Sequence, residues 1–174
     1  MKDPRRERFD KTVLPHLDAA FNLARWLTRN DHDAEDVVQE AYLRAYQFFD
    51  SFHGGDGRAW LLRIVRNTCY SWLEKNRPRE SAEAFDETKH SAERTDTGPE
   101  APLVANENRE MLRRALEELP SEFREAIVLR NLEGLSYKEI AAVSGVPIGT
   151  VMSRLARARA RLQECLAGLL PEES

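Results

Sequence analysis

Four arginines and no acidic residue lie in the stretch GVPIGTVMSRLARARARL, residues 145–162. Arginine binds phosphate oxygens and the acceptor edge of guanine through paired hydrogen bonds, which is the chemistry of nucleic-acid binding. At about 100° per residue, a helix gathers the apolar residues on one stripe, which holds Val151, Leu155, Ala158 and Leu162. The opposite face holds small residues and arginines, namely Ser153, Ala156, Arg157 and Ala160, with Arg154 and Arg161 at its edges. Small side chains let a helix backbone approach DNA closely, so the pattern predicts a DNA-contacting helix.

The residues before this helix carry the signals of another helix and a tight turn. Ser136 and Glu139 have the spacing of a capping box, in which each side chain accepts a hydrogen bond from the other residue's backbone N–H. Gly145 stands where a helix end needs a left-handed residue, and Pro147 begins the next helix. An arginine-rich helix alone is more often a solvated surface. The cap, the turn and the basic second helix together favour a helix-turn-helix that binds DNA.

A second basic stretch, residues 58–79, contains six bases and one acid, interleaved with aromatic residues. Arginines that follow a phosphate backbone and rings that stack on bases suit single-stranded nucleic acid. Taken alone this signal is weak, because Trp60 is equally suited to a core, and for Trp72 a core position is the favoured interpretation. Asn67 has an amide that can pair with a base edge, and the glycine-rich loop at 52–57 could close over an extruded base.

The apolar residues recur with helical spacing, and no stretch alternates as a strand does, so the sequence predicts an all-α protein. We expect an amphipathic helix over 17–27 and a second helix with Asp33 as its N-cap. A loop is expected at 52–57, because three glycines in four positions disfavour a helix, and a third helix is expected over 58–75.

Between residues 80 and 100 the composition changes to seven acids, two bases and one aromatic residue. This stretch has too little apolar area to offset the entropy of ordering it. We therefore predict two small helical domains, residues 1–79 and 106–174, joined by a flexible acidic linker over 80–105. The second domain contains the helix-turn-helix.

The composition argues against several other classes of protein. Of the 174 residues, 41% are hydrophobic and 32% charged, and no apolar run is long enough for a membrane span or a secretory signal. Cys69 and Cys165 form no CxxC pair and are expected to be buried thiols. The histidines lack metal-ligand spacing, and the sequence has no catalytic triad or phosphate-loop pattern. We therefore expect a cytoplasmic protein that is not an enzyme and has neither a metal site nor a cofactor.

Three ordered motifs give a sharper interpretation. They are AEDVVQEAYLRAY at 34–46, GRAWLLRIVRNTCYSWL at 57–73 and LPSEFREAIVLRNLEGLSYKEIAAVSGVPIGTVMSRLARAR at 119–159. With them the sequence closely resembles the bacterial sigma factors of the extracytoplasmic-function group, over both predicted domains. The resemblance implies a dissociable subunit of RNA polymerase. Its first domain (sigma region 2) would grip the polymerase clamp and melt the minus-ten promoter element, and its second (sigma region 4) would read the minus-thirty-five element.

The resemblance and the residue patterns together give three sets of site residues. The set expected to bind core RNA polymerase is Asp36, Gln39 and Glu40, which the residues alone would describe as a solvated face. The set expected to bind minus-ten DNA is Phe52, His53, Gly54, Arg63, Arg66, Asn67 and Tyr70. The set expected to bind minus-thirty-five DNA is Thr150, Met152, Ser153, Arg154, Ala156, Arg157 and Arg161. By resemblance, Trp60 supports the fold.

Two positions depart from the family pattern. Ser71 stands where many members have aspartate, which affects the expected minus-ten contact. Met152 stands where lysine or arginine is common, which should weaken one DNA contact and change the preferred minus-thirty-five sequence. The resemblance also implies a further partner, an anti-sigma factor that holds the protein inactive.

The net charge of the whole chain is -4, although both predicted DNA-binding surfaces are basic. A negative chain with an acidic linker should bind free DNA poorly. We therefore hypothesise that the two surfaces act together only when polymerase holds them at promoter spacing.

Other classes remain as alternatives. A stand-alone helix-turn-helix repressor accounts for residues 121–166 but gives no role to residues 58–79 or to AEDVVQE. An adaptor that binds only proteins would tolerate Arg157→Ala. An enzyme is disfavoured because the acids are spread over surfaces and the linker.

Overall fold

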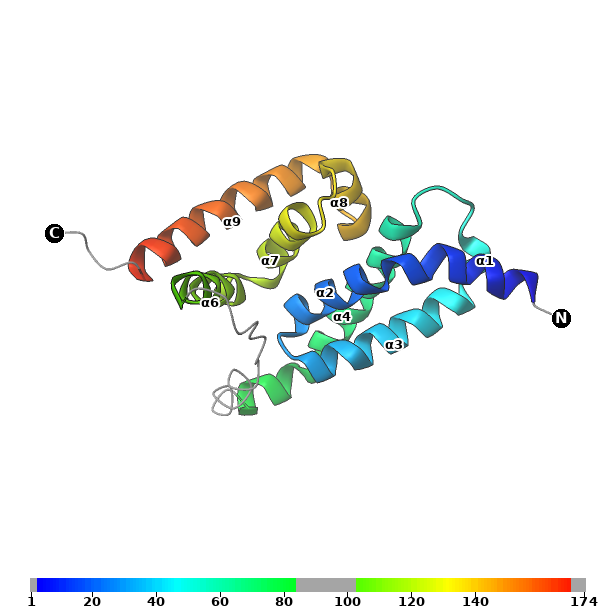
Figure 1. The fold of residues 1–174 in the computed structure, drawn as a ribbon, viewed down its shortest axis with the longest axis horizontal. Helices are drawn as coiled ribbons and strands as arrows, with labels where there is room; N and C mark the ends of the chain where they lie inside the picture. The colour runs from blue at the N-terminus through cyan, green and yellow to red at the C-terminus, as the bar shows by residue number, and fades with distance from the viewer. Residues whose placement is uncertain (1–2, 84–102, 170–174) are drawn as a thin grey trace.

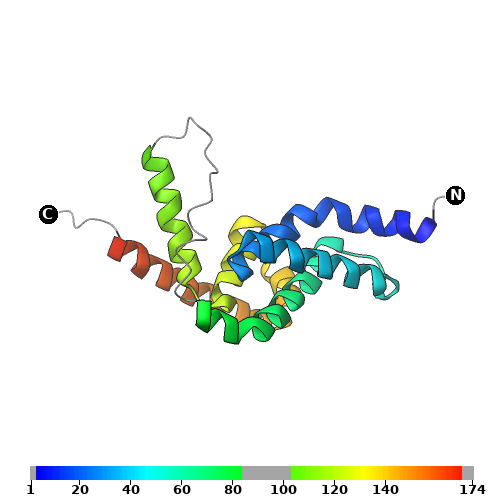
Figure 2. The same cartoon turned by 90° about the horizontal axis from the view of Figure 1, so that it is seen from below.

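The computed structural model describes the backbone of residues 3–83 and 103–169. These residues form helices and connecting turns, with no strand in either range, which confirms the all-α prediction (Figures 1 and 2). The predicted linker over 80–105 lies mainly outside the described residues. The helices on either side of that gap reach residue 83 and start at residue 103.

The first domain consists of four α-helices and two short 3-10 turns. In chain order they are α1 (Pro4–Val13), η1 (Leu14–His16), α2 (Leu17–Thr28), α3 (Asp31–Gln47), η2 (Phe49–Ser51) and α4 (Gly57–Glu83). Helices α2, α3 and α4 pack against one another in all three pairings. Their core is lined by residues at the predicted helical spacing, among them Ala24, Leu27, Val37, Leu61 and Val65.

Helix α1 was not predicted, and one aromatic residue fastens it to the domain. The ring of Phe9 is fully buried and meets Tyr42, Tyr46 and Phe49 edge-on, with centroids 5.1 to 5.3 Å apart. The helix begins regularly, because the Asp3 side chain accepts a hydrogen bond from the backbone N–H of Arg5. Only two residues of the helix are buried, so its apolar pattern is too sparse to indicate a helix from sequence.

The start of α3 differs from the prediction. Asp33 was expected to be the N-cap, but Asn30 has this role, and its side-chain oxygen accepts from the Asp33 N–H at 3.0 Å. The cap moves because the link from α2 is so short. Arg29 ends α2 in the left-handed conformation with φ 59°, and the next residue is already extended and starts α3.

The loop predicted at 52–57 is present, although Gly57 is already the first residue of α4. Gly54 and Gly55 have φ of 94° and 96°, which glycine adopts without strain. The aromatic rings of Phe52 and Trp60 meet at 5.1 Å and both contact Phe49. Trp60 therefore supports this corner of the fold, as the resemblance implied.

The second domain consists of α6 (Leu103–Glu118), α7 (Ser121–Ile127), η3 (Val128–Leu132), α8 (Tyr137–Ser144) and α9 (Ile148–Leu169). Helix α9 packs against α6, α7 and α8. Its apolar stripe is buried as predicted: Val151, Leu155 and Ala158 are at most 1% exposed, and Leu162 is partly buried.

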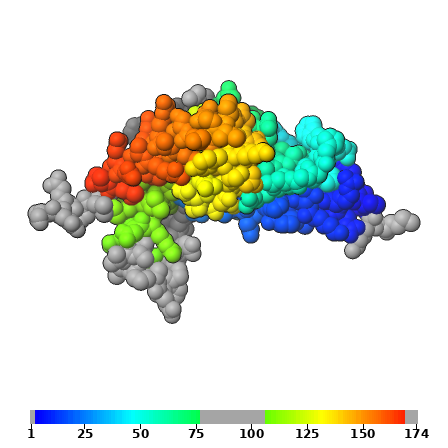
Figure 3. Space-filling view, turned by 90° about the horizontal axis from the view of Figure 1, so that it is seen from above, coloured from blue at the N-terminus to red at the C-terminus, as the bar shows by residue number. Residues whose placement is uncertain are grey.

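The two domains lie against each other. Helix α4 of the first domain packs along α8 of the second, and α2 contacts α7. In the space-filling view the surface of the second domain around residues 130–145 abuts the surface of α4 (Figure 3). The amino-terminal end of α1 and the carboxy-terminal end of α9 point in opposite directions (Figure 1).

Candidate nucleic-acid interface

Helices α8 and α9 form the predicted helix-turn-helix. The Ser136 hydroxyl accepts from the Glu139 N–H at 3.1 Å, and the Glu139 carboxylate accepts from the Ser136 N–H at 3.0 Å, which completes the capping box. Gly145 ends α8 with φ 69°, and its N–H donates to the Ala141 carbonyl at 2.9 Å. After this turn α9 packs against α8 with one side, and the opposite side of α9 is uncovered.

The small-residue side of α9 faces solvent, as its pattern predicts. We call Ser153, Ala156, Arg157 and Ala160 the α9 face, and all four are exposed. The two edge arginines are held by their own domain. Arg154 lies 3.6 Å from the Glu122 carboxylate, and the Arg161 guanidinium sits over the Phe123 ring at 5.2 Å. Such contacts orient the guanidinium groups beside the face instead of leaving them to sample many rotamers.

Thr150 and Met152 complete the set expected at minus-thirty-five DNA. Thr150 is half-buried, whereas Met152 is 53% exposed beside the α9 face. An exposed thioether offers apolar contact but no charge. The position is therefore suited to touching a base methyl group rather than a phosphate.

The residues expected at minus-ten DNA divide between a loop and a helix. Phe52, His53 and Gly54 lie in the loop at the amino-terminal end of α4, where Phe52 packs inward and the other two are exposed. The remaining four share one side of α4 at spacing i, i+3, i+4 and i+7, and we call this side the α4 face: Arg63, Arg66, Asn67 and Tyr70. The structure brings these four together on one helix.

The α4 face is turned toward the second domain, which the sequence did not predict. The Arg66 Nε donates to the Glu125 carboxylate at 2.8 Å, and the Tyr70 hydroxyl donates to the other oxygen of that carboxylate at 3.0 Å. The Arg63 guanidinium donates to the Ala142 carbonyl at 3.2 Å. Asn67 remains exposed, and its side-chain oxygen accepts from Arg66 at 3.3 Å.

The set expected to bind polymerase lies on the outer side of α3. Asp36, Gln39 and Glu40 are all exposed, and we call them the α3 face. The Glu40 carboxylate accepts a hydrogen bond from Arg44 at 2.6 Å, which fixes its orientation. The arrangement presents acidic and amide groups to a partner from a rigid helix.

Comparison with known proteins identifies the family. The model of Sigma-70 region 2 matches residues 12–79, and that of Sigma-70 region 4 matches residues 109–162. The ECF RNA polymerase sigma-E factor of Escherichia coli strain K12 is 42% identical over 134 residues, covering 73% of this chain and 70% of the relative. The chain belongs to the ECF sigma factors. Members of this family are transcription initiation factors.

A second ECF sigma factor aligns over more of the chain. SigE of Mycolicibacterium smegmatis is 38% identical over 159 residues, or 91% of this chain and 62% of the relative. The chain thus spans less than two thirds of the length of that relative.

Two solved structures are similar to this chain over both domains. The sigma factor RpoE of Bartonella quintana, in complex with the anti-sigma factor NepR, has a TM-score of 0.74 and 34% identity, covering 92% of this chain and 98% of that one. The structure of CnrH with the cytosolic domain of CnrY has a TM-score of 0.63 and 28% identity, covering 94% and 90%. The fold of this ECF sigma factor is thus that of its relatives.

Two exposed apolar residues of the first domain were not predicted from sequence. Leu43 and Phe48 are 62% and 61% exposed, and Leu43 lies one turn beyond the α3 face on the same side. Helical spacing could have indicated that Leu43 is exposed, because this residue falls outside the buried stripe of Val37, Ala41 and Ala45. Leu43 therefore adds exposed apolar surface beside the polar residues of the α3 face.

Glu125 was also missed, and only the tertiary structure shows its role. This carboxylate is 1% exposed, and it accepts hydrogen bonds from both domains. Burial, and next the charge of Glu125, raise the pKa of the Tyr70 hydroxyl, so that Tyr70 stays a hydrogen-bond donor. No sequence pattern could place a glutamate of α7 beside an arginine of α4.

The two cysteines differ from each other. Cys69 is fully buried, as expected, and burial raises the pKa of its thiol, which makes it a poor nucleophile. Cys165 was expected to be buried but is only partly so, with its Sγ 3.8 Å from the Glu118 carboxylate. The prediction failed because Cys165 lies beyond the last buried turn of α9.

The described residues contain neither a cluster of metal ligands nor a helix that could span a membrane. Within 3–83 and 103–169, no three histidine, cysteine or acidic side chains converge as metal ligands. Across the same ranges, every helix is too short or too polar for a bilayer span.

Proposed function

We propose that this ECF sigma factor binds core RNA polymerase and directs it to promoters through three surfaces. The α3 face (Asp36, Gln39 and Glu40) contacts the polymerase clamp. Helix α9 reads the minus-thirty-five element with Thr150, Met152, Ser153, Arg154, Ala156, Arg157 and Arg161. The loop residues Phe52, His53 and Gly54, together with the α4 face, hold and melt the minus-ten element. Such a protein acts in the cytoplasm, where polymerase and promoters are.

The observation that carries this proposal is the α9 face. It presents exposed small residues and Arg157, between two oriented arginines, as the second helix of a capped helix-turn-helix. In this motif the second helix enters the major groove and touches base edges. Family membership then supplies the polymerase as the partner that brings α9 to DNA.

We further propose that an anti-sigma factor controls the protein. The similar sigma factor RpoE of Bartonella quintana was solved in complex with the anti-sigma factor NepR. The exposed Leu43 beside the α3 face gives such a partner apolar surface that overlaps the proposed polymerase contact. A partner bound there would exclude polymerase by competition.

Arg157→Ala tests the role of α9. The change removes an exposed guanidinium without touching the core, so the fold should survive. We expect the complex of holoenzyme and promoter to weaken by about 1 to 3 kcal/mol, because one phosphate or base contact is lost. The measurement is open-complex formation and run-off transcription at promoters found by sequencing transcript starts after overexpression.

The matched control is Arg109→Ala, which removes the same charge from an exposed position on α6. It should leave transcription unchanged. Equal activity of the Arg157→Ala variant and the wild type would contradict the role of α9. If the chain alone bound duplex promoter at physiological salt as tightly as the holoenzyme does, a repressor would be the better description.

A further inference from the structure

The second domain occupies part of the α4 face, at Arg66 and Tyr70, although the α9 face is open. Three of its four residues donate hydrogen bonds to the second domain, and Arg58, one turn earlier on α4, reaches it as well. The two surfaces proposed to bind DNA are therefore in different states in the same molecule. The groups that contact Arg66 and Tyr70 hold the α4 face against the second domain.

At that centre lies the Glu125 carboxylate. One of its oxygens accepts from Arg66 Nε at 2.8 Å and from the Ser144 hydroxyl at 3.2 Å, and the other accepts from the Tyr70 hydroxyl at 3.0 Å. The Arg66 guanidinium also lies over the Tyr70 ring, 4.2 Å from its centroid. Arg66 and Tyr70 thus engage Glu125 as one unit, in which every group has a partner.

The ion pair of Arg58 and Glu139, which also joins the domains, is longer and more exposed than that of Arg66 and Glu125. The Arg58–Glu139 pair is 3.4 Å long and each side chain is 31% exposed, whereas the side chains of Arg66 and Glu125 are 18% and 1% exposed. Solvent-exposed ion pairs contribute little, while removing one partner of a buried pair leaves an uncompensated charge and is costly. Loss of the Glu125 contact should therefore favour separation of the domains more than loss of the Arg58–Glu139 pair.

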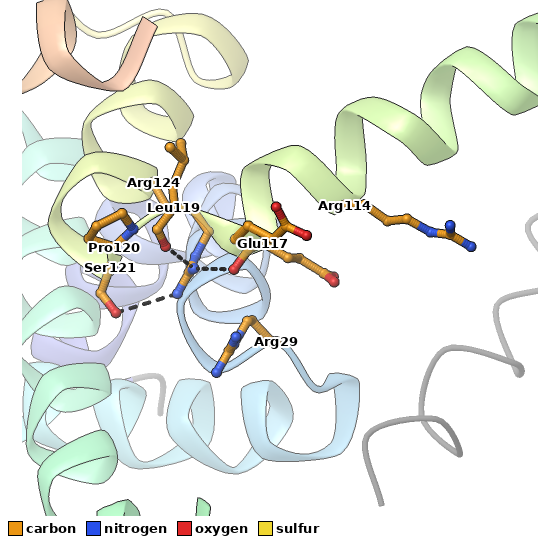
Figure 4. A pocket seen from close by; sticks show the side chains of 8 residues that line it. Arg29, Arg114, Glu117, Leu119, Pro120, Ser121 and Arg124 are labelled. Atoms are coloured by element: carbon orange, nitrogen blue, oxygen red, sulfur yellow. Dashed lines mark hydrogen bonds between the residues drawn. The ribbon is translucent and has the colours of Figure 1, made fainter. Parts of the chain in front are cut away.

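A second buried residue, Arg124, strengthens its own domain more than the contact between domains. Its guanidinium donates to the Leu119 carbonyl at 2.8 Å, the Glu117 carbonyl at 3.0 Å and the Ser121 hydroxyl at 3.4 Å (Figure 4). Its bond across the interface, to the Leu27 carbonyl of α2, is 3.5 Å long. Arg124 orders the turn between α6 and α7, which precedes the helix that carries Glu125.

Glu125 accepts hydrogen bonds from Arg66 and Tyr70, as the phosphates of a nucleic-acid strand would. A carboxylate and a phosphate both accept hydrogen bonds from a guanidinium group, and the Tyr70 ring, here covered by Arg66, is a surface on which a base can stack. A strand and Glu125 cannot occupy the same donors together. The face is therefore available to only one of them at a time.

We propose that Glu125 is an intramolecular docking site for Arg66 and Tyr70, and that the α4 face must leave it before contacting nucleic acid. The second part of this proposal rests on the proposed function of the α4 face, whereas the docking itself does not. The similar Bartonella quintana sigma factor superposes over 92% of this chain with a TM-score of 0.74. Neither domain alone reaches that coverage, so a similar placement of the domains occurs there in a complex with an anti-sigma factor. In this chain, Glu125 supplies a contact that needs no partner.

The experiment compares full-length variants by small-angle X-ray scattering in the absence of polymerase. Glu125→Gln keeps the size of the side chain but removes its charge, so we expect a larger radius of gyration than in the wild type. Glu107→Gln makes the same charge change at an exposed position of the second domain and should leave the radius unchanged. An unchanged radius for Glu125→Gln, or an equal increase for Glu107→Gln, would overturn the docking site.

A second pair of variants covers the case in which Glu125→Gln fails to fold, as judged by circular dichroism. Tyr70→Phe and Ser144→Ala each remove one hydroxyl donor to Glu125, but only that of Tyr70 comes from the other domain. Tyr70→Phe should enlarge the molecule and Ser144→Ala should not. The same response to both changes would also overturn the proposal.

Binding of a single-stranded minus-ten oligonucleotide separates this inference from the proposed function. If docking hides the α4 face, the Glu125→Gln variant should bind the strand at least about tenfold more tightly than the wild type, because a larger fraction of its molecules is competent to bind. A larger radius without tighter binding would leave the docking site in place and refute the minus-ten role of the α4 face.

Discussion

Arginine has three different uses in this sigma factor, and its surroundings decide which one applies. Arg157 is exposed on a face of small residues and is available to a large anionic partner. Arg66 is mostly buried against Glu125, where its charge is neutralised inside the protein. Arg124, 3% exposed, donates to backbone carbonyls and holds a turn. Counting basic residues in the sequence could not separate a binding residue from a structural one.

The polymerase contact makes a prediction for Asp36. Asp36→Arg reverses a charge at an exposed position of the α3 face, so the fold should be retained while the partner surface meets a like charge. We expect loss of co-purification with core polymerase by at least about tenfold, since each 1.4 kcal/mol of repulsion changes affinity tenfold.

Asp18→Arg is its control, because Asp18 is an exposed acid on α2, outside the α3 face. This variant should still co-purify. If Asp36→Arg co-purified as well as Asp18→Arg, the polymerase would have to bind elsewhere on the molecule.

At the scale of elements, the helices with strong apolar stripes were predictable, and the sparsely buried one was not. Helix α9 has a regular stripe and a capped, glycine-terminated helix before it, and both were found from sequence. Helix α1 buries only Phe9 and Val13, and the packing of Phe9 against three aromatic rings of α3 and η2 becomes visible only in three dimensions. The cap of α3 was misplaced because Asn30 and Asp33 are both good capping residues, and only the left-handed Arg29 selects between them.

The capping box of α8 predicts a dependence of stability on pH. The hydrogen bond from the Ser136 N–H, and next a side-chain hydrogen bond from Asp56, lower the pKa of Glu139 to about 2 from its ordinary 4.5, with a smaller effect from Arg58. A carboxyl group whose pKa is lower in the folded state stabilises that state above pH 4.5, and this contribution is lost as the pH falls toward 2. Glu139→Gln should therefore be less stable than the wild type at pH 7 and nearly equal to it at pH 2.

Thermal unfolding followed by circular dichroism at a series of pH values measures this difference. Glu107→Gln makes the same change at an exposed position of α6, outside the capping box, and serves as the control. A stability difference between wild type and Glu139→Gln that stayed constant from pH 7 to pH 2 would show that the Glu139 carboxylate is not selectively stabilised.

At the scale of the whole molecule, the sequence indicated which surfaces exist but not how they face each other. The positions of the α3, α4 and α9 faces follow from helical spacing, because each lies on one side of one helix. The contact of Arg66 and Tyr70 with Glu125 joins residues 59 and 55 positions apart across two domains. Such a contact depends on the packing of α4 on α8, for which neither helix carries a local signal.

The packed domains also refine the idea that polymerase must hold the two basic surfaces apart. The negative net charge and the acidic stretch between the domains disfavour binding to free DNA. The Glu125 contact adds a local reason, since it occupies the donors of the α4 face. A partner that binds the separated domains more tightly than the packed ones would shift the equilibrium toward separation. The free-energy shift equals the difference between its binding free energies for the two states.

Association of the full chain with purified core RNA polymerase tests the promoter-selecting role most directly. Titration of fluorescently labelled chain into core enzyme, followed by anisotropy, should show saturable one-to-one binding that unlabelled chain displaces and that the Asp36→Arg variant does not displace. Failure of the wild-type chain to bind core polymerase at any concentration tested would contradict the account.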